Sequence, residues 1–395
     1  LWAPLAPWEQ VRVVSTSARH SAVVTSLGGV YTCGDGGDGA LGHGDLASHA
    51  HLKLVTYFSD SSTSSGQPQG QAGEGQPGCE LVGVSCGADL FGSHTACLDS
   101  RGRVYTFGLG SACGRGNRRP HPVPGRVVIE HAPSGNEADG LTPPDPEEGD
   151  RVAQVCAGGG FCLALTRSGL LWAWGNWMGG RLGLGPVPSK EDTSYMHSGS
   201  KRKRLLPLLL RPRRVRKGLE SCGPLASVSC GDAHCAAVTQ RGQVLVWGQN
   251  ESGQLGLGPS RRSGRLENHF YPTPLPPFKG FGDHPALFGG GGGSLSGLSG
   301  LSGGGLAKAA ALAARAGASA QVAVHVACGG AHTLAIDARG EVWAWGGLGG
   351  ACIGLGGDDA GSASRSASRS AGPAGGHTLR PTSELQAARA VRQRA

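Results

Sequence analysis

Five times along the 395-residue chain, a histidine or phenylalanine is followed 14 residues later by a glycine that ends an apolar stretch. The five pairs are His20/Gly34, His94/Gly108, Phe161/Gly175, His234/Gly248 and His332/Gly346. A fixed interval that recurs through a chain indicates a repeat architecture in which each copy is one structural unit. The function must therefore be inferred from the repeat architecture and from the segments that depart from the repeat.

Each copy contains the pattern of a β-hairpin. A second glycine lies eight residues after the first marker and closes a short polar turn, as in Thr239-Gln-Arg-Gly242. Glycine adopts positive φ at little cost, so it permits the tight reversal between two strands. Apolar alternation precedes this turn, as in Cys235-Ala-Ala-Val238, and follows it, as in Gln243-Val-Leu-Val-Trp247. The pattern predicts two short strands joined by a tight turn.

Two further segments complete each copy. A Gly-x-Gly pair follows the second strand, as in Gly256/Gly258, and a proline-led segment follows later, as in Tyr271-Pro-Thr-Pro-Leu275. About four short strands per copy are typical of a propeller blade, which must stack on neighbours to bury its faces. We therefore expect an all-β chain, a β-propeller of four-stranded blades. It has five recognisable repeats and the start of a sixth, as an open or incomplete ring.

The most regular copy joins Val228-Ser-Cys-Gly-Asp-Ala-His234 to Gly242-Gln-Val-Leu-Val-Trp-Gly248 and Gly253-Gln-Leu-Gly-Leu-Gly258. This text resembles the regulator of chromosome condensation repeat family, whose members form propellers that are commonly seven-bladed. The first copy departs from it, with Thr16-Ser17 in place of Cys-Gly, and the second carries extra residues before His94. The resemblance implies a propeller scaffold with diverse functions.

The repeats divide the chain into cores and insertions, which we take to form one propeller domain over residues 1–395. The cores are 11–45, 82–117, 152–185, 226–258 and 324–356. The insertions are 46–80, 118–150, 186–222, 259–321 and 357–388. The insertions are rich in Gly, Ser, Pro and Ala, which favours disorder, except for an Ala-rich stretch at 306–315 that predicts a short helix. Because they occupy one place in the repeat, they are expected on one face of the ring.

The ends of the chain suggest a fragment of a larger protein. No methionine begins it, no secretory signal is visible, and residues 379–395 are similar to the opening strand of another blade. No apolar run approaches the roughly 18 residues that a membrane-spanning helix needs. We expect a soluble protein in the cytoplasm, the nucleus or both, without membrane contact.

The residue types that suggest chemistry recur too regularly to be catalytic. Histidine occupies the same position in four copies and phenylalanine in the third, which suits a structural hydrogen bond better than catalysis. Several of the 12 cysteines also repeat in position, which indicates packing in a reducing compartment rather than disulfides. No C-x-x-C pair is present, and the glycine-rich text lacks the Lys-Ser/Thr of a phosphate loop. We therefore predict no enzyme activity, catalytic residue, cofactor or metal.

One segment stands apart by its charge. Between residues 201 and 217 the chain carries nine basic residues and no acidic one, against a net charge of +8 for the whole chain. They are Lys201, Arg202, Lys203, Arg204, Arg211, Arg213, Arg214, Arg216 and Lys217. Three interpretations remain open: a nuclear-import signal, contact with nucleic acid or chromatin, or a solvated loop in which 211–215 is the polar opening strand of the fourth blade. Base stacking is disfavoured because no aromatic residue interrupts the segment.

The functional hypothesis is a non-enzymatic protein-interaction propeller. The family resemblance implies, as its best-described activity, guanine nucleotide exchange on a Ran-like small GTPase together with chromatin contact. The repeat motif specifies a scaffold, so it assigns no residue to that activity. The alternative is a substrate-binding or targeting module of a large multidomain protein, such as a ubiquitin ligase or a kinase-associated regulator. A protein partner is expected in both cases.

Overall fold

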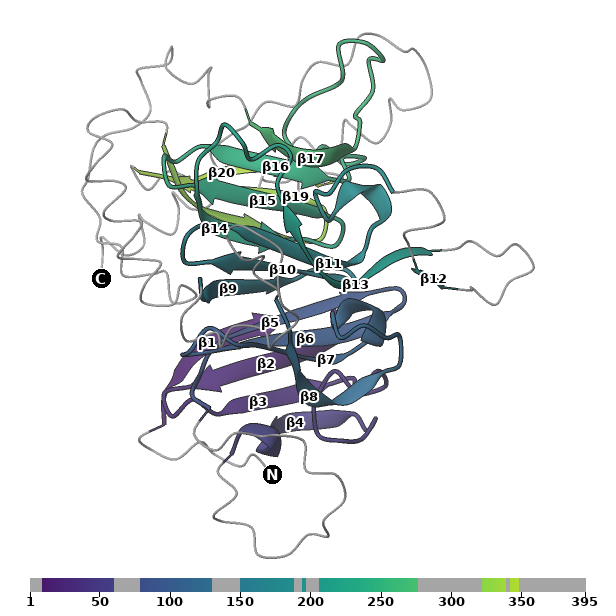
Figure 1. Cartoon of the computed structure of the whole chain (residues 1–395), viewed down its shortest axis with the longest axis vertical. Coiled ribbons are helices and arrows are strands. Elements are labelled where there is room, and N and C mark those ends of the chain that lie inside the picture. The colour runs from purple at the N-terminus through teal and green to yellow at the C-terminus, as the bar shows by residue number, and fades with distance from the viewer. Residues whose placement is uncertain are drawn as a thin grey trace, which may run out of the picture. The chain divides into compact units, whose positions relative to one another are not determined.

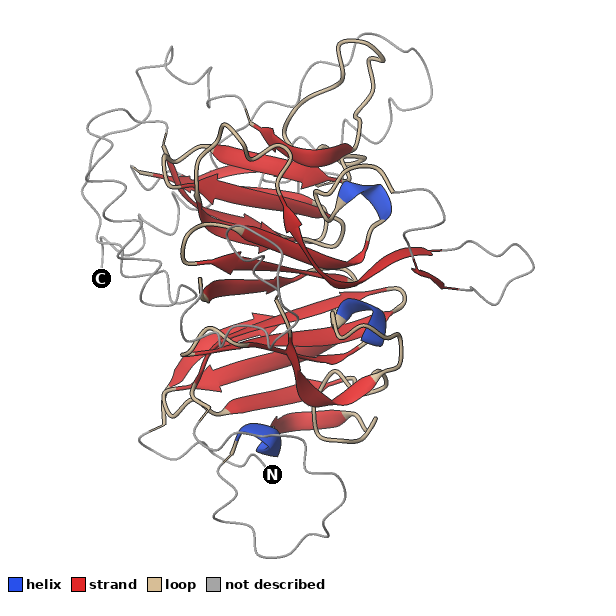
Figure 2. Cartoon of the chain, viewed as in Figure 1, coloured by secondary structure: helices blue, strands red, loops and turns tan. Residues whose placement is uncertain are grey.

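The computed structural model describes residues 9–59, 79–129, 150–187, 194–196, 206–275, 322–338 and 342–347. Strands dominate these residues (Figure 2), and the short 3-10 helices among them are η1 (Thr56–Phe58), η3 (Gly110–Ala112) and η4 (Met178–Gly180). Within the described part of the chain, no helix is long and apolar enough to cross a membrane. The fold is all-β, as the alternating apolar pattern predicted.

The strands form five antiparallel sheets in chain order, and the chain divides into two compact units (Figure 1). The first unit holds three sheets. Sheet one contains β1 (Val11–Thr16), β2 (His20–Thr25), β3 (Val30–Gly34) and β4 (His49–Leu54). Sheet two contains β5 (Leu81–Asp89), β6 (Gly92–Asp99), β7 (Val104–Gly108) and β8 (His121–Val127). Sheet three contains β9 (Val152–Ala157), β10 (Phe161–Thr166), β11 (Leu171–Asn176), β13 (Leu206–Val215) and β12 (Ser194–Met196).

The second unit holds the other two sheets. Sheet four contains β14 (Leu225–Cys230), β15 (His234–Thr239), β16 (Val244–Gly248) and β17 (His269–Pro274). Sheet five contains β18 (Ala323–Cys328), β19 (His332–Asp337) and β20 (Val342–Gly346). In sheets one, two and four each strand pairs with the next along the chain, which is the up-and-down order of a propeller blade. The predicted fold class, a β-propeller of four-stranded blades, is confirmed.

The 14-residue interval is a hairpin register. His234 lies directly opposite Gly248 across β15 and β16, and His94 lies opposite Gly108 across β6 and β7. The same pairing joins the marker residues of the other three copies. The fixed interval therefore reflects two strands of constant length that are joined by one type of turn. An inserted residue between the markers would shift the pairing.

The core of each unit lies between successive sheets. In the first unit, Val24 and Val30 of sheet one pack in one cluster with Leu81 and Phe107 of sheet two. A second cluster joins sheet two to sheet three through residues such as Trp174. In the second unit, apolar side chains of sheets four and five form one cluster. Within each unit, neighbouring sheets therefore bury the faces that they turn toward each other, which is why one repeat alone could not be stable.

The outer strands lie where insertions were expected. Residues 46–80, 118–150, 186–222 and 259–321 contain β4, β8, β13 and β17 respectively. The assignment of 211–215 to the opening of the fourth blade is wrong, because β13 pairs with β11 in sheet three. The short β12 pairs with β13 and gives that sheet a fifth strand. The expected helix at 306–315, the insertion 357–388 and the expected sixth-repeat strand at 379–395 lie outside the described residues.

Candidate interaction surfaces

The repeated histidines link neighbouring sheets. His20 Nε2 lies 2.8 Å from Thr95 Oγ1, and His234 Nε2 lies 2.9 Å from Thr333 Oγ1. In each case the partner immediately follows the next copy's marker residue. His94 makes the equivalent contact with the thiol of Cys162 at 3.2 Å. These histidines bind one sheet to the next, which is the structural role that the repeat pattern predicted.

A second set of bonds reinforces the same junctions. In sheet five, Thr333 Oγ1 and Trp345 Nε1 both donate to the carbonyl of Gln254, at 2.8 and 2.9 Å. Trp174 Nε1 donates to the carbonyl of Ala112 and Trp247 Nε1 to that of Arg181, at 2.9 and 3.1 Å. The accepting carbonyls belong to the loop that follows the third strand of the preceding copy. The Gly-x-Gly loops are thus anchored on tryptophans of the next blade.

The buried histidines are neutral near pH 7. Burial lowers the pKa of His94 to about 3 and the pKa of His20 and His234 to about 4. A general acid or base at neutral pH needs a pKa near 7 and access to a substrate, so these rings are poorly suited to that work. Within the described part of the chain, no three His, Cys, Asp or Glu side chains gather as metal ligands.

The residues of the basic segment differ in their contacts and exposure. Arg213 lies over the ring of Trp177 at 5.6 Å, and Lys217 lies over the ring of Tyr271 at 4.3 Å. Both cations are thereby held on aromatic faces. Arg211 and Arg216 are exposed, and Arg214 is partly exposed. Lys201, Arg202, Lys203 and Arg204 lie outside the described residues.

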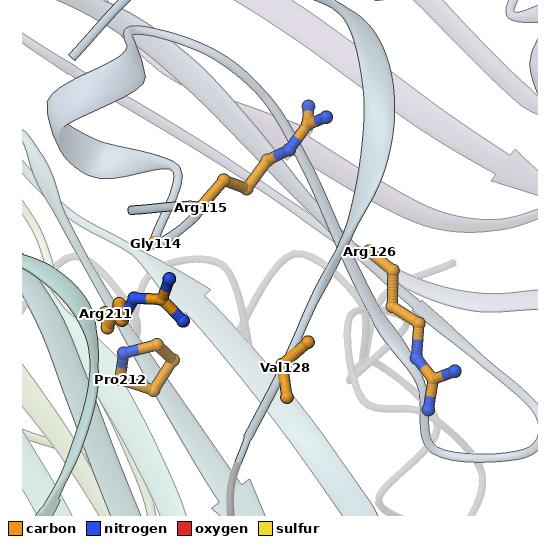
Figure 3. Close-up of a pocket in the computed structure, with 6 residues that line it drawn as sticks. All are labelled: Gly114, Arg115, Arg126, Val128, Arg211 and Pro212. Carbon is orange, nitrogen blue, oxygen red and sulfur yellow. The ribbon is translucent and has the colours of Figure 1, made fainter. Parts of the chain in front are cut away.

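Arg211 lies in a groove that the sequence did not reveal. The groove has a volume of about 200 Å³ and is lined by Gly114, Arg115, Arg126, Val128, Arg211 and Pro212 (Figure 3). We call it the arginine groove. Its walls are β13 of sheet three and, from sheet two, β8 with the loop that precedes it. The amide of Gly116 donates to the carbonyl of Leu210 at 2.8 Å, which fixes this loop on β13.

A second unusual surface is the tip of the hairpin between β5 and β6. These strands have nine and eight residues, whereas the corresponding strands of the other sheets have six. At the tip, the side chain of Leu90 is 92% exposed and that of Phe91 is 47% exposed. Asp89 Oδ1 accepts the amides of Phe91 and Gly92 at 2.8 and 3.1 Å, so the turn is held by its own hydrogen bonds. We call residues 89–92 the hairpin tip.

Comparison with known sequences places the repeats in a family. Two profiles described as "Regulator of chromosome condensation (RCC1) repeat" match the chain. One matches residues 152–176, 226–254 and 323–347, and the other matches 168–238 and 241–292. The chain contains repeats of the regulator of chromosome condensation type. The matched segments contain the marker pairs of the third, fourth and fifth copies of this RCC1-repeat protein.

Relatives of this RCC1-repeat protein are longer than the chain. It is 29% identical over 252 residues to the human E3 ubiquitin-protein ligase HERC2, an alignment that covers 63% of the chain and 4% of HERC2. It is 26% identical over 354 residues to the mitochondrial RCC1 domain-containing protein RUG3 of Arabidopsis thaliana, covering 87% of the chain and 55% of RUG3. The chain therefore spans only part of the length of these relatives.

A solved structure supports the fold of the RCC1-repeat protein. The crystal structure of human WBSCR16 superposes with a TM-score of 0.55 at 22% sequence identity, covering 88% of this chain and 65% of that one. At this identity the likeness concerns the fold alone. The arginine groove and the hairpin tip must therefore be interpreted from the residues of this chain.

Sequence reasoning found one part of these surfaces and missed the rest. Arg211 was predicted from the charge of its segment, but Arg115 and Arg126 were not, because neither lies in a long basic run. A signal existed in Gly114-Arg-Gly-Asn-Arg-Arg119, where three arginines lie in the repeat's shortened loop. The extra residues before His94 were noticed, but their exposure was not predicted, since Leu90-Phe91 is typical of a buried strand.

Proposed function

We propose that this protein is a non-enzymatic interaction propeller whose hairpin tip docks on a protein partner. The hairpin tip carries the proposal because it presents two adjacent large apolar side chains on a turn that is held by its own hydrogen bonds. Partner docking commonly relies on a small apolar anchor of this kind. The repeated histidines and tryptophans are engaged in the packing of the propeller, because they bind neighbouring sheets.

The finer proposal is regulation of a small GTPase. Family resemblance supports guanine nucleotide exchange on a Ran-like GTPase, with chromatin contact through basic residues. The test mixes the purified chain at micromolar concentration with the GTPase loaded with fluorescent GDP and follows nucleotide release. Acceleration that disappears in the double variant L90S/F91S would support exchange through the hairpin tip. No acceleration by the unchanged chain would reject exchange and leave the general interaction role.

The second candidate is a targeting or substrate-binding module of a large protein. The relation to HERC2 favours it, since the matched part is only 4% of that ubiquitin ligase. A photo-crosslinking amino acid at position 90, compared with one at the exposed Leu27, tests docking by the hairpin tip in cells. Crosslinking of one partner from position 90 alone supports the proposal, while equal products from both positions contradict it.

The basic segment supports a further proposal on location. We propose a cytoplasmic and nuclear protein in which Lys201–Arg204 directs import, while Arg214 and Arg216 are available to phosphates of nucleic acid or chromatin. Replacing Lys201–Arg204 with alanine should abolish nuclear accumulation of a fluorescent fusion. An unchanged distribution would reject the import role. Accumulation in mitochondria, the compartment in RUG3's name, would reject the location altogether.

A further inference from the structure

We infer that the arginine groove is a docking site for an acidic, extended segment of a protein partner. This site is separate from the hairpin tip and can be tested independently of it. The inference begins with charge. Three guanidinium groups, those of Arg115, Arg126 and Arg211, lie around one groove of about 200 Å³. Within the described residues, none of them makes an ion pair with a carboxylate.

The acidic residues that the structure describes in the first unit are engaged elsewhere. Asp99 binds Arg103, Asp35 binds Arg19, and Glu80 binds Arg12. The others among the described residues hold tyrosine, serine or backbone groups; they are Glu9, Asp38, Asp45, Asp89 and Asp150. The positive charge of the groove is therefore uncompensated within this part of the chain. The positive charge also affects a neighbouring histidine. Burial, together with the charge of Arg115, lowers the pKa of His121 to about 4.

The arrangement of the cations favours several anions over one. In Figure 3 the head groups of Arg115 and Arg126 point in different directions, and that of Arg211 lies beside the loop that carries Gly114. Arg115 Nη1 also donates to the carbonyl of Val123 at 3.3 Å, which holds it against β8. Three cations that face different directions suit several separate anions better than one compact phosphoryl group. A row of carboxylates along an extended chain could engage them one after another.

The rest of the lining favours a polypeptide over nucleic acid. Val128 is 50% exposed and Pro212 is partly buried, so apolar surface alternates with the cations. Among the described residues no aromatic side chain lines the groove, and single-stranded nucleic acid binds best where bases can stack. The volume suits one or two side chains rather than a helix or a duplex.

Side chains, rather than the addition of a β-strand to the sheet, must recognise the partner segment in the arginine groove. β8 is the edge strand of sheet two, but Pro122 and Pro124 remove two of its amide donors. The carbonyl of Pro122 is already occupied by the amide of Gly44 at 2.9 Å. An added strand would therefore find few backbone partners, and the guanidinium groups must supply most of the binding. Guanidinium pairs with carboxylates are strong because both partners are charged and the fork geometry matches.

The test measures binding of a fluorescein-labelled peptide with the sequence Glu-Asp-Glu-Glu-Asp-Glu to the full chain by anisotropy. We expect saturable binding that weakens with salt and falls at least tenfold in the double variant R126Q/R211Q. The variant R167Q is the matched control, since Arg167 is exposed in the same unit, and it should change affinity less than twofold. Thermal unfolding must be unchanged in both variants.

Three comparison probes decide between occupants. The same peptide with Gln and Asn should not bind, and a neutral peptide that binds equally well would overturn the inference. A single phosphoserine peptide or a thymidine oligonucleotide that binds more tightly than the acidic peptide, and loses that binding in R126Q/R211Q, would assign the groove to phosphate instead.

An acidic segment of this chain is the remaining candidate to occupy the groove. Residues 130–149 contain six carboxylates: Glu130, Glu137, Asp139, Asp145, Glu147 and Glu148. If only a variant with these six changed to amides binds the peptide, while the unchanged chain does not, the groove serves this chain and the inference of a partner is overturned.

Discussion

The hydrogen bond between His234 and Thr333 has a fixed direction, with the histidine as the donor. Thr333 Oγ1 lies 2.8 Å from the carbonyl of Gln254 and gives its single proton to it, so His234 Nε2, at 2.9 Å, must donate to the threonine. The ring is therefore the neutral tautomer with hydrogen on Nε2. His20, Thr95 and the carbonyl of Ala40 form the same chain of bonds in the first unit, at 2.8 and 2.7 Å. The junction between blades depends on a neutral imidazole.

Acid should therefore destabilise the protein before carboxylates titrate. Burial lowers the pKa of His20 and His234 to about 4, whereas a histidine in the unfolded chain titrates near 6.5. Between these values the unfolded state binds protons that the folded state does not, so stability falls as pH decreases from about 6.5 to about 4. Each such histidine contributes a slope of at most about 1.4 kcal/mol per pH unit.

The free energy of unfolding in urea at pH 7, 5.5 and 4.5 measures this effect. In the variant H234Q the amide keeps a donor but does not titrate, so the pH dependence should decrease by up to one proton. The exposed His51 provides the control, and H51Q should leave the slope unchanged. A slope identical in H234Q and the unchanged chain would contradict the assignment of a buried, neutral ring.

The marker glycine Gly248 should tolerate a side chain far less well than Gly253, although both have positive φ. Gly248 has φ of 108°, and an added Cβ would lie 2.5 Å from the carbonyl oxygen of Ala233. Gly253 has φ of 74°, but nothing lies within 4 Å of an added Cβ. We expect G253A to cost about 1 kcal/mol and G248A about 3 kcal/mol or more, because only the latter adds a steric clash to backbone strain. Equal unfolding midpoints for the two variants would reject this explanation of the interval.

The fold was predictable because its signal is local and repeated. The interval from His234 to Gly248 reports a hairpin register, and a register is set within one stretch of sequence. The arginine groove was not predictable, because Arg115 and Arg211 come from different sheets and meet only through the stacking of those sheets. The exposure of Leu90 was equally hidden, since an apolar pair in a short insertion does not reveal that the hairpin extends past its neighbours. The strand at 211–215 was assigned to the wrong sheet because its sequence indicates a strand but not its partner.

The buried ion pair of sheet two should contribute more than an exposed one. Asp99 Oδ2 accepts from Arg103 Nε at 2.5 Å, and Asp99 Oδ1 accepts the amide of Arg103 at 2.7 Å. Both side chains are buried, so D99A leaves an arginine without its carboxylate and should cost about 3–5 kcal/mol. The exposed pair of Arg19 and Asp35 is the control, and D35A should cost less than about 1 kcal/mol. Urea unfolding of both variants measures the difference, and similar losses would show that burial does not decide it.

The buried cysteines should be unreactive until the protein unfolds. All 11 cysteines among the described residues are free, and burial raises the pKa of Cys86 and Cys113 to about 12 and that of Cys97 and Cys162 well above the usual range. The thiolate is the reactive form, and it is scarce at pH 8 for such groups. Reaction with an aromatic disulfide reagent at pH 8 should therefore show a fast phase from the partly exposed thiols and a slow phase that becomes fast in urea. Loss of the slow phase in the folded protein would mean that the sheets open readily. It would weaken the structural role given to these residues.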